Sequence, residues 1–153
     1  MKLETFTPRL NSFLKEASAI ALRSYAPSKV PTVGLHINPN DGYVGLATHS
    51  EKIEGSAALG IPEFDDPEVH YTHFDEWDEN YWNKKENVSF ADKEVSMESC
   101  QGDEEYAEIF VEWSMSVLKD FAQSSDSPFS GIMLCVHPVS SDPYRLWDPK
   151  IKA

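Results

Sequence analysis

The fold is decided by the stretch TVGLHINPNDGYVGLAT, residues 32–48. Apolar side chains occupy every second position on both sides of the segment PNDG, residues 39–42, and this alternation is typical of half-buried strands. Pro, Asn, Asp and Gly are the residue types that a tight reversal of the chain needs. The stretch therefore predicts a β-hairpin whose apolar face consists of Val33, Leu35, Ile37, Val44 and Leu46.

Helical periodicity appears on both sides of this hairpin. Thr7 and Pro8 have the residue types of an N-cap and a first helical position, and apolar residues then recur at helical spacing from Leu10 to Ala21. We expect this first helix to end before Pro27. A second helix is predicted after Asp103, and its apolar stripe comprises Tyr106, Ile109, Phe110, Trp113, Val117 and Phe121.

Further strands are predicted with shorter signals. The apolar run Ile132–Val136 indicates a strand in the middle of a sheet, and the tail from Pro143 to Pro149 either adds an edge strand or packs over the core. Alternation around Val88 and Phe90 favours one more strand. The segment from His73 to Trp82 fits either a helical turn or an extended chain, so its conformation stays open.

These elements together predict an α+β fold. We expect an N-terminal helix, a β-hairpin, an irregular acidic segment, a second amphipathic helix and a C-terminal core strand, with the helices packed on a mostly antiparallel sheet. The length of 153 residues and the hydrophobic content of 41% predict a single globular domain over residues 1–153.

Charge restricts the classes of partner. The chain has 26 acidic and 13 basic residues and a formal net charge of -13, which repels nucleic acid and anionic lipid. We therefore expect no nucleic-acid partner and no membrane association. The N-terminal residues contain no uninterrupted apolar run of the kind found in signal peptides, so we expect a cytoplasmic protein. The acidity either keeps the protein soluble or serves a positively charged protein partner.

The most unusual segment runs from Glu63 to Glu79. It contains eight carboxylates and no Lys or Arg, and aromatic residues are interleaved with the acids. One interpretation is a recognition surface with aromatic anchors inside a charged rim. The other is that the aromatic side chains point into the core while the acids face water. The candidate partner-binding residues are Glu63, Asp65, Asp66, Glu68, Tyr71, Phe74, Asp75, Glu76, Trp77, Asp78, Glu79, Tyr81 and Trp82.

Motifs of common enzyme classes are missing from the sequence. It contains no GxSxG, GxxxxGK[ST], GxGxxG or HExxH motif and no CxxC pair. His70 and His73 lie among several carboxylates, which would suit a divalent metal ion such as zinc or manganese. Histidines that are solvated or hydrogen-bonded explain the same pattern more simply. We therefore expect no cofactor.

The order of elements also resembles a known class of proteins. The words HFDEWDENYW at residues 73–82, the hairpin at residues 32–48 and the helix around Glu112 and Trp113 resemble small acidic bacterial proteins that are often grouped with immunity proteins of polymorphic toxin systems. This resemblance implies a cytoplasmic antitoxin that binds a secreted toxin domain and neutralises it, commonly by covering a basic active site.

Three functions follow from these observations. The leading prediction is a non-catalytic binding module, an immunity-type inhibitor whose acidic face, centred on Glu63 to Glu79, binds a basic toxin domain. The first alternative is a metal-dependent enzyme that uses His70, His73 and neighbouring carboxylates to activate water. The second is a DNA mimic, which needs regularly spaced acids along an elongated surface. Exposed aromatic residues could equally form a homodimer interface.

Overall fold

The predicted hairpin forms as strands β1 (Thr32–Asn38) and β2 (Tyr43–His49), which pair antiparallel with Asn38 opposite Tyr43. The computed structural model describes residues 1–24, 32–49, 70–83, 85–97, 104–124, 133–138 and 145–147. Asn38 closes the turn through hydrogen bonds to the amide and the carboxylate of Asp41. Gly42 has a φ angle of 78°, a left-handed conformation that favours glycine. The hairpin prediction is confirmed.

A five-stranded sheet is built around this hairpin in the order β3-β2-β1-β6-β7. Its other members are β3 (His70–His73), β6 (Met133–Pro138) and β7 (Arg145–Trp147). Strand β6 runs parallel to β1, whereas the remaining neighbours pair antiparallel. The mostly antiparallel sheet, the interior position of β6 and the edge strand in the tail are therefore confirmed.

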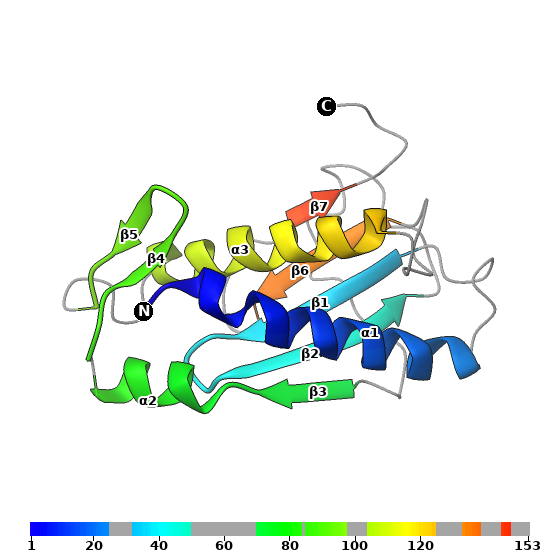
Figure 1. Ribbon diagram of the computed structural model, residues 1–153, viewed down its shortest axis with the longest axis horizontal. Helices are drawn as coiled ribbons and strands as arrows, with labels where there is room; N and C mark the ends of the chain where they lie inside the picture. Colours follow the sequence, from blue (N-terminus) through cyan, green and yellow to red (C-terminus); the bar gives the residue numbers. More distant parts are fainter. Residues whose placement is uncertain are drawn as a thin grey trace.

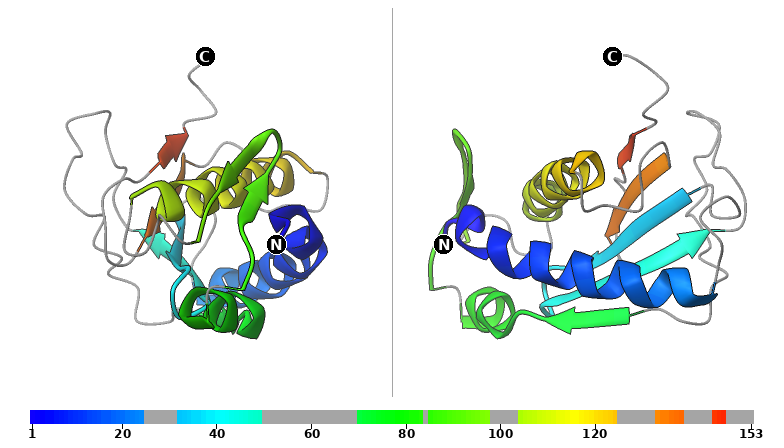
Figure 2. Two further views of the ribbon diagram at one scale, coloured as in Figure 1. Left: turned by 90° about the vertical axis from the view of Figure 1, so that its left-hand side faces the viewer. Right: turned by 45° about the vertical axis from the view of Figure 1, so that its right-hand side comes forward.

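Two long helices cover one face of this sheet (Figures 1 and 2). Helix α1 (Thr7–Ser24) follows a short 3-10 helix, η1 (Leu3–Phe6), and contacts β2 and β3. Helix α3 (Glu104–Gln123) contacts β6 and β1 and packs against α1. No helix in the described ranges has the length and apolar content that crossing a membrane requires. Both predicted helices are present, and the structure has the predicted α+β fold.

The core lies between the sheet and the helices. Register places the apolar residues of β1, β2 and β6 on the same face, since Leu35 is opposite Leu46 in β2 and beside Val136 in β6. Every apolar position that the sequence assigned to the hairpin face and to the stripe of α3 is buried. From α1 the buried residues of the predicted stripe are Leu10, Phe13, Leu14 and Ala17.

The start of α1 differs from the prediction. Thr7 was expected to be an N-cap, but its backbone is helical because η1 continues directly into α1. The Thr7 hydroxyl instead accepts a hydrogen bond from the Trp113 indole of α3 at 3.1 Å. Thr7 therefore joins two helices rather than capping one.

The acidic segment also differs from the prediction where it is described. Residues 70–83 are not irregular: β3 joins the edge of the sheet and helix α2 (Asp75–Asn83) follows after Phe74. Strand β4 (Val88–Phe90), which the sequence predicted, pairs with β5 (Lys93–Val95) in a second, two-stranded sheet. This small hairpin packs on α3 and on the N-terminal residues, where the Ser89 amide donates to the Met1 carbonyl. Hydrogen bonds with tertiary partners thus order a region whose sequence has no long period.

An aromatic cluster centred on Trp77 fixes α2 to the rest of the molecule. The Trp77 ring stacks on Phe74 with centroids 4.2 Å apart and meets Phe110 and Trp113 of α3 edge-on at 4.8 and 5.5 Å. Phe6 of η1 also contacts this ring edge-on. Such pairs stabilise a fold beyond the area that they bury. The cluster thus joins η1, α2 and α3.

Substituting the two central tryptophans separately tests how much a hydrogen bond contributes to the stability of this cluster. Both rings are fully buried, but the Trp113 N–H donates to Thr7 whereas the Trp77 N–H has no acceptor among the described residues. We expect Trp77→Phe to lower the free energy of unfolding by about 1 kcal/mol less than Trp113→Phe does, because only the Trp113 substitution removes a hydrogen bond. Urea unfolding of both variants measures this difference. An equal or larger loss in Trp77→Phe would contradict it.

Candidate functional site

Helix α2 divides its residues between the core and the surface. Its nine residues include four acids and no Lys or Arg. Phe74, which precedes the helix, lies in the core with Trp77 and Tyr81, and Asn80 is buried as well. The side-chain amide of Asn80 donates a hydrogen bond to the Glu86 carbonyl and accepts one from the Glu86 backbone N–H. These two bonds anchor the chain that follows α2. This buried face sets the orientation of the whole helix.

The opposite face of α2 consists of Asp75, Asp78, Glu79 and Trp82, and we call it the α2 acidic face. These residues follow the spacing i, i+3, i+4, i+7, which places them on the same side of a helix. Trp82 is 61% exposed, which exceeds the values of Tyr71 and Tyr43, the other exposed large hydrophobic residues in the described part of the chain. Acids in the first turn suit the helix dipole and need no partner to explain them, but an exposed tryptophan gains nothing from that dipole.

The structure separates the predicted partner-binding aromatics into two groups. Phe74, Trp77 and Tyr81 belong to the core, so their interpretation as surface anchors is wrong for the described structure and the inward-pointing alternative holds for them. Tyr71 and Trp82 are exposed. The reason is amphipathicity: once α2 forms, its apolar side must cover the end of the core, and only residues on the other side remain accessible.

Glu76 lies beside the α2 acidic face but is held by α1. Its two carboxylate oxygens accept hydrogen bonds from one nitrogen of Arg9, Nη1, at 2.8 and 2.9 Å. The Arg9 guanidinium also lies over the Phe74 ring, 4.6 Å from its centroid. Hydrogen bonding to Arg9 is the main cause that lowers the pKa of Glu76 below its ordinary value. Glu76 is therefore a structural ion-pair partner.

His73 connects the hairpin turn to α2. Its Nε2 atom is 2.8 Å from the Asp41 carbonyl oxygen and its Nδ1 atom is 2.5 Å from the Asp75 carboxylate. The ring also packs on Tyr43, with centroids 4.5 Å apart. Both ring nitrogens thus face groups of the protein itself.

The alternative metal site at positions 70 and 73 gains no support from this geometry. The two positions are three residues apart in β3, and positions an odd number apart belong to opposite faces of a strand. Among the described residues, no three His, Cys, Asp or Glu side chains converge as metal ligands. His73 is better explained as the link between Asp41 and Asp75.

The other exposed aromatic residues that the structure describes lie on the sheet. Tyr43 and Tyr71 are 47% and 56% exposed and stand on neighbouring strands, next to the end of β3 that leads into α2. Tyr43 is paired with His73, and Tyr71 is two residues from His73 in the same strand. All three therefore lie on one face of the sheet, opposite the face with the buried apolar residues. Four further predicted residues, Glu63, Asp65, Asp66 and Glu68, lie outside the described residues.

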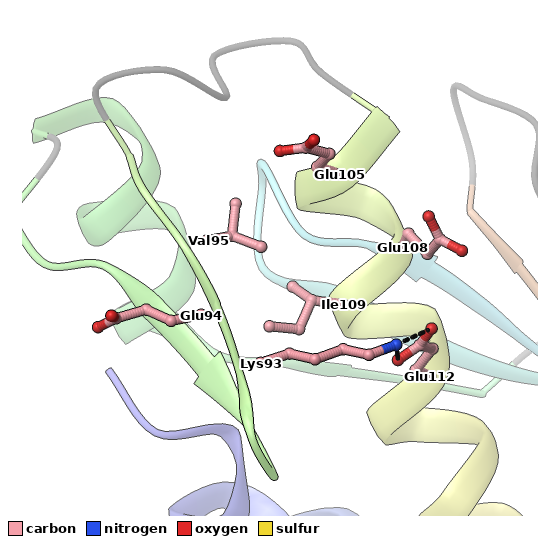
Figure 3. Close-up of a pocket in the computed structure, with 7 residues that line it drawn as sticks. All are labelled: Lys93, Glu94, Val95, Glu105, Glu108, Ile109 and Glu112. Atoms are coloured by element: carbon pink, nitrogen blue, oxygen red, sulfur yellow. Dashed lines mark hydrogen bonds and ion pairs between the residues drawn. The ribbon is translucent and has the colours of Figure 1, made fainter.

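A groove that the sequence did not predict lies between β5 and α3 and has a volume of about 340 Å³. Figure 3 shows that Lys93 and Val95 of β5 point toward α3, whereas Glu94 points away. The facing residues of α3 follow helical spacing, so they form a stripe along the helix. This stripe consists of Glu105, Glu108, Ile109 and Glu112.

Lys93 makes an ion pair across this groove. Its ammonium donates to both carboxylate oxygens of Glu112 at 2.8 and 2.7 Å (Figure 3). This hydrogen bonding is the main cause that raises the pKa of Lys93, and the charges of Glu112, Glu108 and Asp92 act in the same direction. The groove therefore has a negative potential that favours a cation.

The sequence contained a signal for this groove. Glu105, Glu108 and Glu112 recur at i, i+3 and i+7 beside the apolar stripe of α3, and such spacing predicts an acidic line along one helix face. Its pairing with β5 could not be predicted, because two-residue alternation in a three-residue strand does not indicate which element the strand will contact.

The Arg9–Glu76 ion pair should make the free energy of unfolding depend on pH. A carboxyl group whose pKa is lowered in the folded state contributes stability that is present above its ordinary pKa and is lost as the pH falls through the folded value. Both side chains are about half exposed, so we expect Glu76→Gln to lower the free energy of unfolding at pH 7 by at most about 1 kcal/mol. The difference from wild type should shrink as the pH falls below the ordinary pKa of a glutamate, and it should disappear once Glu76 is protonated in the folded protein.

Urea unfolding at a series of pH values from 7 downward measures this effect. Glu16→Gln, which removes an exposed carboxylate from α1, is the matched control and should show no loss at pH 7, because the protein already has a net charge of -13. A Glu76→Gln deficit that stays constant down to acid pH would show that the ion pair is not its origin.

Comparisons of the chain with protein-family models, curated proteins and solved structures found no match. The chemistry and geometry of the α2 acidic face and of the groove between β5 and α3 are therefore the basis on which a function can be assigned.

Proposed function

We propose that this protein is a non-catalytic binding module that recognises a positively charged protein through the α2 acidic face. In its most specific form, the proposal is an immunity-type inhibitor that binds a basic toxin domain in the cytoplasm and neutralises it. The observation that carries the proposal is Trp82, which is 61% exposed and shares its helix face with Asp75, Asp78 and Glu79.

Exposure of Trp82 has a physical cost that binding would remove. A large aromatic ring in water is unfavourable, and tryptophan is enriched among the residues that dominate the energy of protein interfaces. Its near neighbours on the helix are carboxylates, which supply the polar rim that surrounds such anchors. A tryptophan needed only for the fold would turn inward, as Trp77 does on the other side of the same helix.

Electrostatics support a basic partner rather than a second copy of this chain. In a symmetric dimer through the α2 acidic face, the carboxylates of one helix would approach those of the other, and like charges at an interface are unfavourable. A positively charged partner would instead be steered toward the face by the net charge of -13. The rate of association should therefore fall as salt screens this attraction.

Affinity capture with variants of the α2 acidic face tests this proposal. Wild-type protein is used as bait for lysate and secreted fraction of the source cells at low and moderate salt, with mass spectrometry of the captured proteins. We expect a basic protein to be captured, and Trp82→Ala to weaken its binding by about 30-fold or more, as loss of a hot-spot residue does. Asp78→Lys should slow its association.

Asp120→Lys is the matched control, because it makes the same charge reversal on the exposed surface of the last turns of α3. Capture that survives Asp120→Lys but is lost with Asp78→Lys and Trp82→Ala supports the proposal. Equal capture by all four baits would show that net charge, and not this face, holds the partner. Absence of any basic protein from the wild-type eluate would contradict the proposal itself.

A further inference from the structure

The groove between β5 and α3 differs from an ordinary acidic surface because it has an apolar floor. Ile109 of α3 is buried and Val95 of β5 is partly buried against the core, and both line the space between the two elements. Glu105 and Glu112 of α3 stand beside this floor, whereas the Glu108 carboxylate points away from β5 (Figure 3). Such a site is amphipathic: it offers apolar surface at the bottom and negative charge at the rim.

The position of Lys93 indicates which kind of side chain this groove can bind. Its side chain reaches from β5 across the groove, and its ammonium binds Glu112 (Figure 3). Lysine and arginine are the residues that lay an aliphatic stem along apolar surface while the charged head stays at a polar rim. Lys93 pairs with Glu112, and Glu105 adds a second carboxylate from the same stripe of α3, so the groove stays negative with Lys93 in place.

We propose that this groove is a docking site for an arginine or lysine side chain of the partner protein, which competes with Lys93 for the carboxylates of α3. The inference rests on the proposed function, since it assumes a basic partner, and it adds a second contact that uses neither Trp82 nor any other residue of the α2 acidic face. Lys93 acts as an internal competitor that occupies part of the groove in the free protein.

The size and charge of the groove favour a side chain as the occupant. A volume of about 340 Å³ is at the small end of the range for ligand pockets and suits a single extended side chain. Arginine fits best, because its planar guanidinium can bind a carboxylate through two parallel hydrogen bonds. The positive end of the α3 dipole lies at Glu104, so a cation is more stable beside Glu112 than beside Glu105, which is in the first turn.

Hexaarginine, acetylated and amidated at its ends, is a probe for this site. Methyl NMR signals of Val95 and Ile109 report on the groove, and the indole N–H signal of Trp82 reports on the α2 acidic face. We expect hexaarginine to shift the Val95 and Ile109 signals at low salt. The Lys93→Gln variant should bind about two- to fivefold more tightly at the groove, because removal of the internal ion pair frees Glu112.

Lys85→Gln is the matched control. Lys85 also pairs with a glutamate, Glu79 of the α2 acidic face, so its loss changes the net charge equally at another site. We expect this variant to leave the dissociation constant measured at Val95 and Ile109 within about twofold of wild type, because ions in solution screen the effect of a distant charge.

The outcomes separate this inference from the proposed function. Silent Val95 and Ile109 signals with a responding Trp82 would overturn the groove as a docking site and leave the proposed function in place. Responding groove signals with a silent Trp82 would support the groove and contradict the placement of the partner on α2. Equal tightening by Lys93→Gln and Lys85→Gln would show a general charge effect and overturn the inference.

Discussion

Burial of the Trp77 ring is the constraint on which the arrangement of α2 depends. The ring stacks on Phe74 and meets Phe110 and Trp113 of α3, so the core can close at this end only if this side of α2 faces inward. A helix is rigid, and fixing one side fixes the other. The exposure of Trp82 on the outer side follows from this packing, as does the separation of the acids of α2 from the core.

The carboxylates in this protein have different structural roles, which the sequence alone does not distinguish. Glu76 binds Arg9 of α1, Asp75 binds His73, and Glu112 binds Lys93 of β5. Each of these acids links two segments of the chain, and exposed pairs of this kind add little stability individually. The acidic character of the surface is therefore partly structural. What distinguishes the candidate sites is apolar surface next to the charge, at Trp82 and at Val95.

The hairpin and the two long helices could be predicted because their periodicity extends over many residues. Alternation through residues 32–48 and the stripe of α3 left one arrangement that buries the apolar positions assigned to the hairpin face and to that stripe. Residues 70–83 could not be predicted in the same way. β3 has four residues and α2 has nine, and segments this short are stabilised by tertiary packing rather than by their own propensity. The predicted irregular segment was wrong here for that reason.

The sequence by itself determined the α+β class, the apolar faces and the strongly negative charge, since composition and period are local properties of the chain. Only the tertiary structure decided which aromatic residues of 73–82 are core and which are surface, because amphipathic aromatics are ambiguous until a neighbouring element covers one side. The groove between β5 and α3 is likewise a tertiary property. Its lining comes from two segments that are separate in the sequence, and no local pattern indicates that they will face each other.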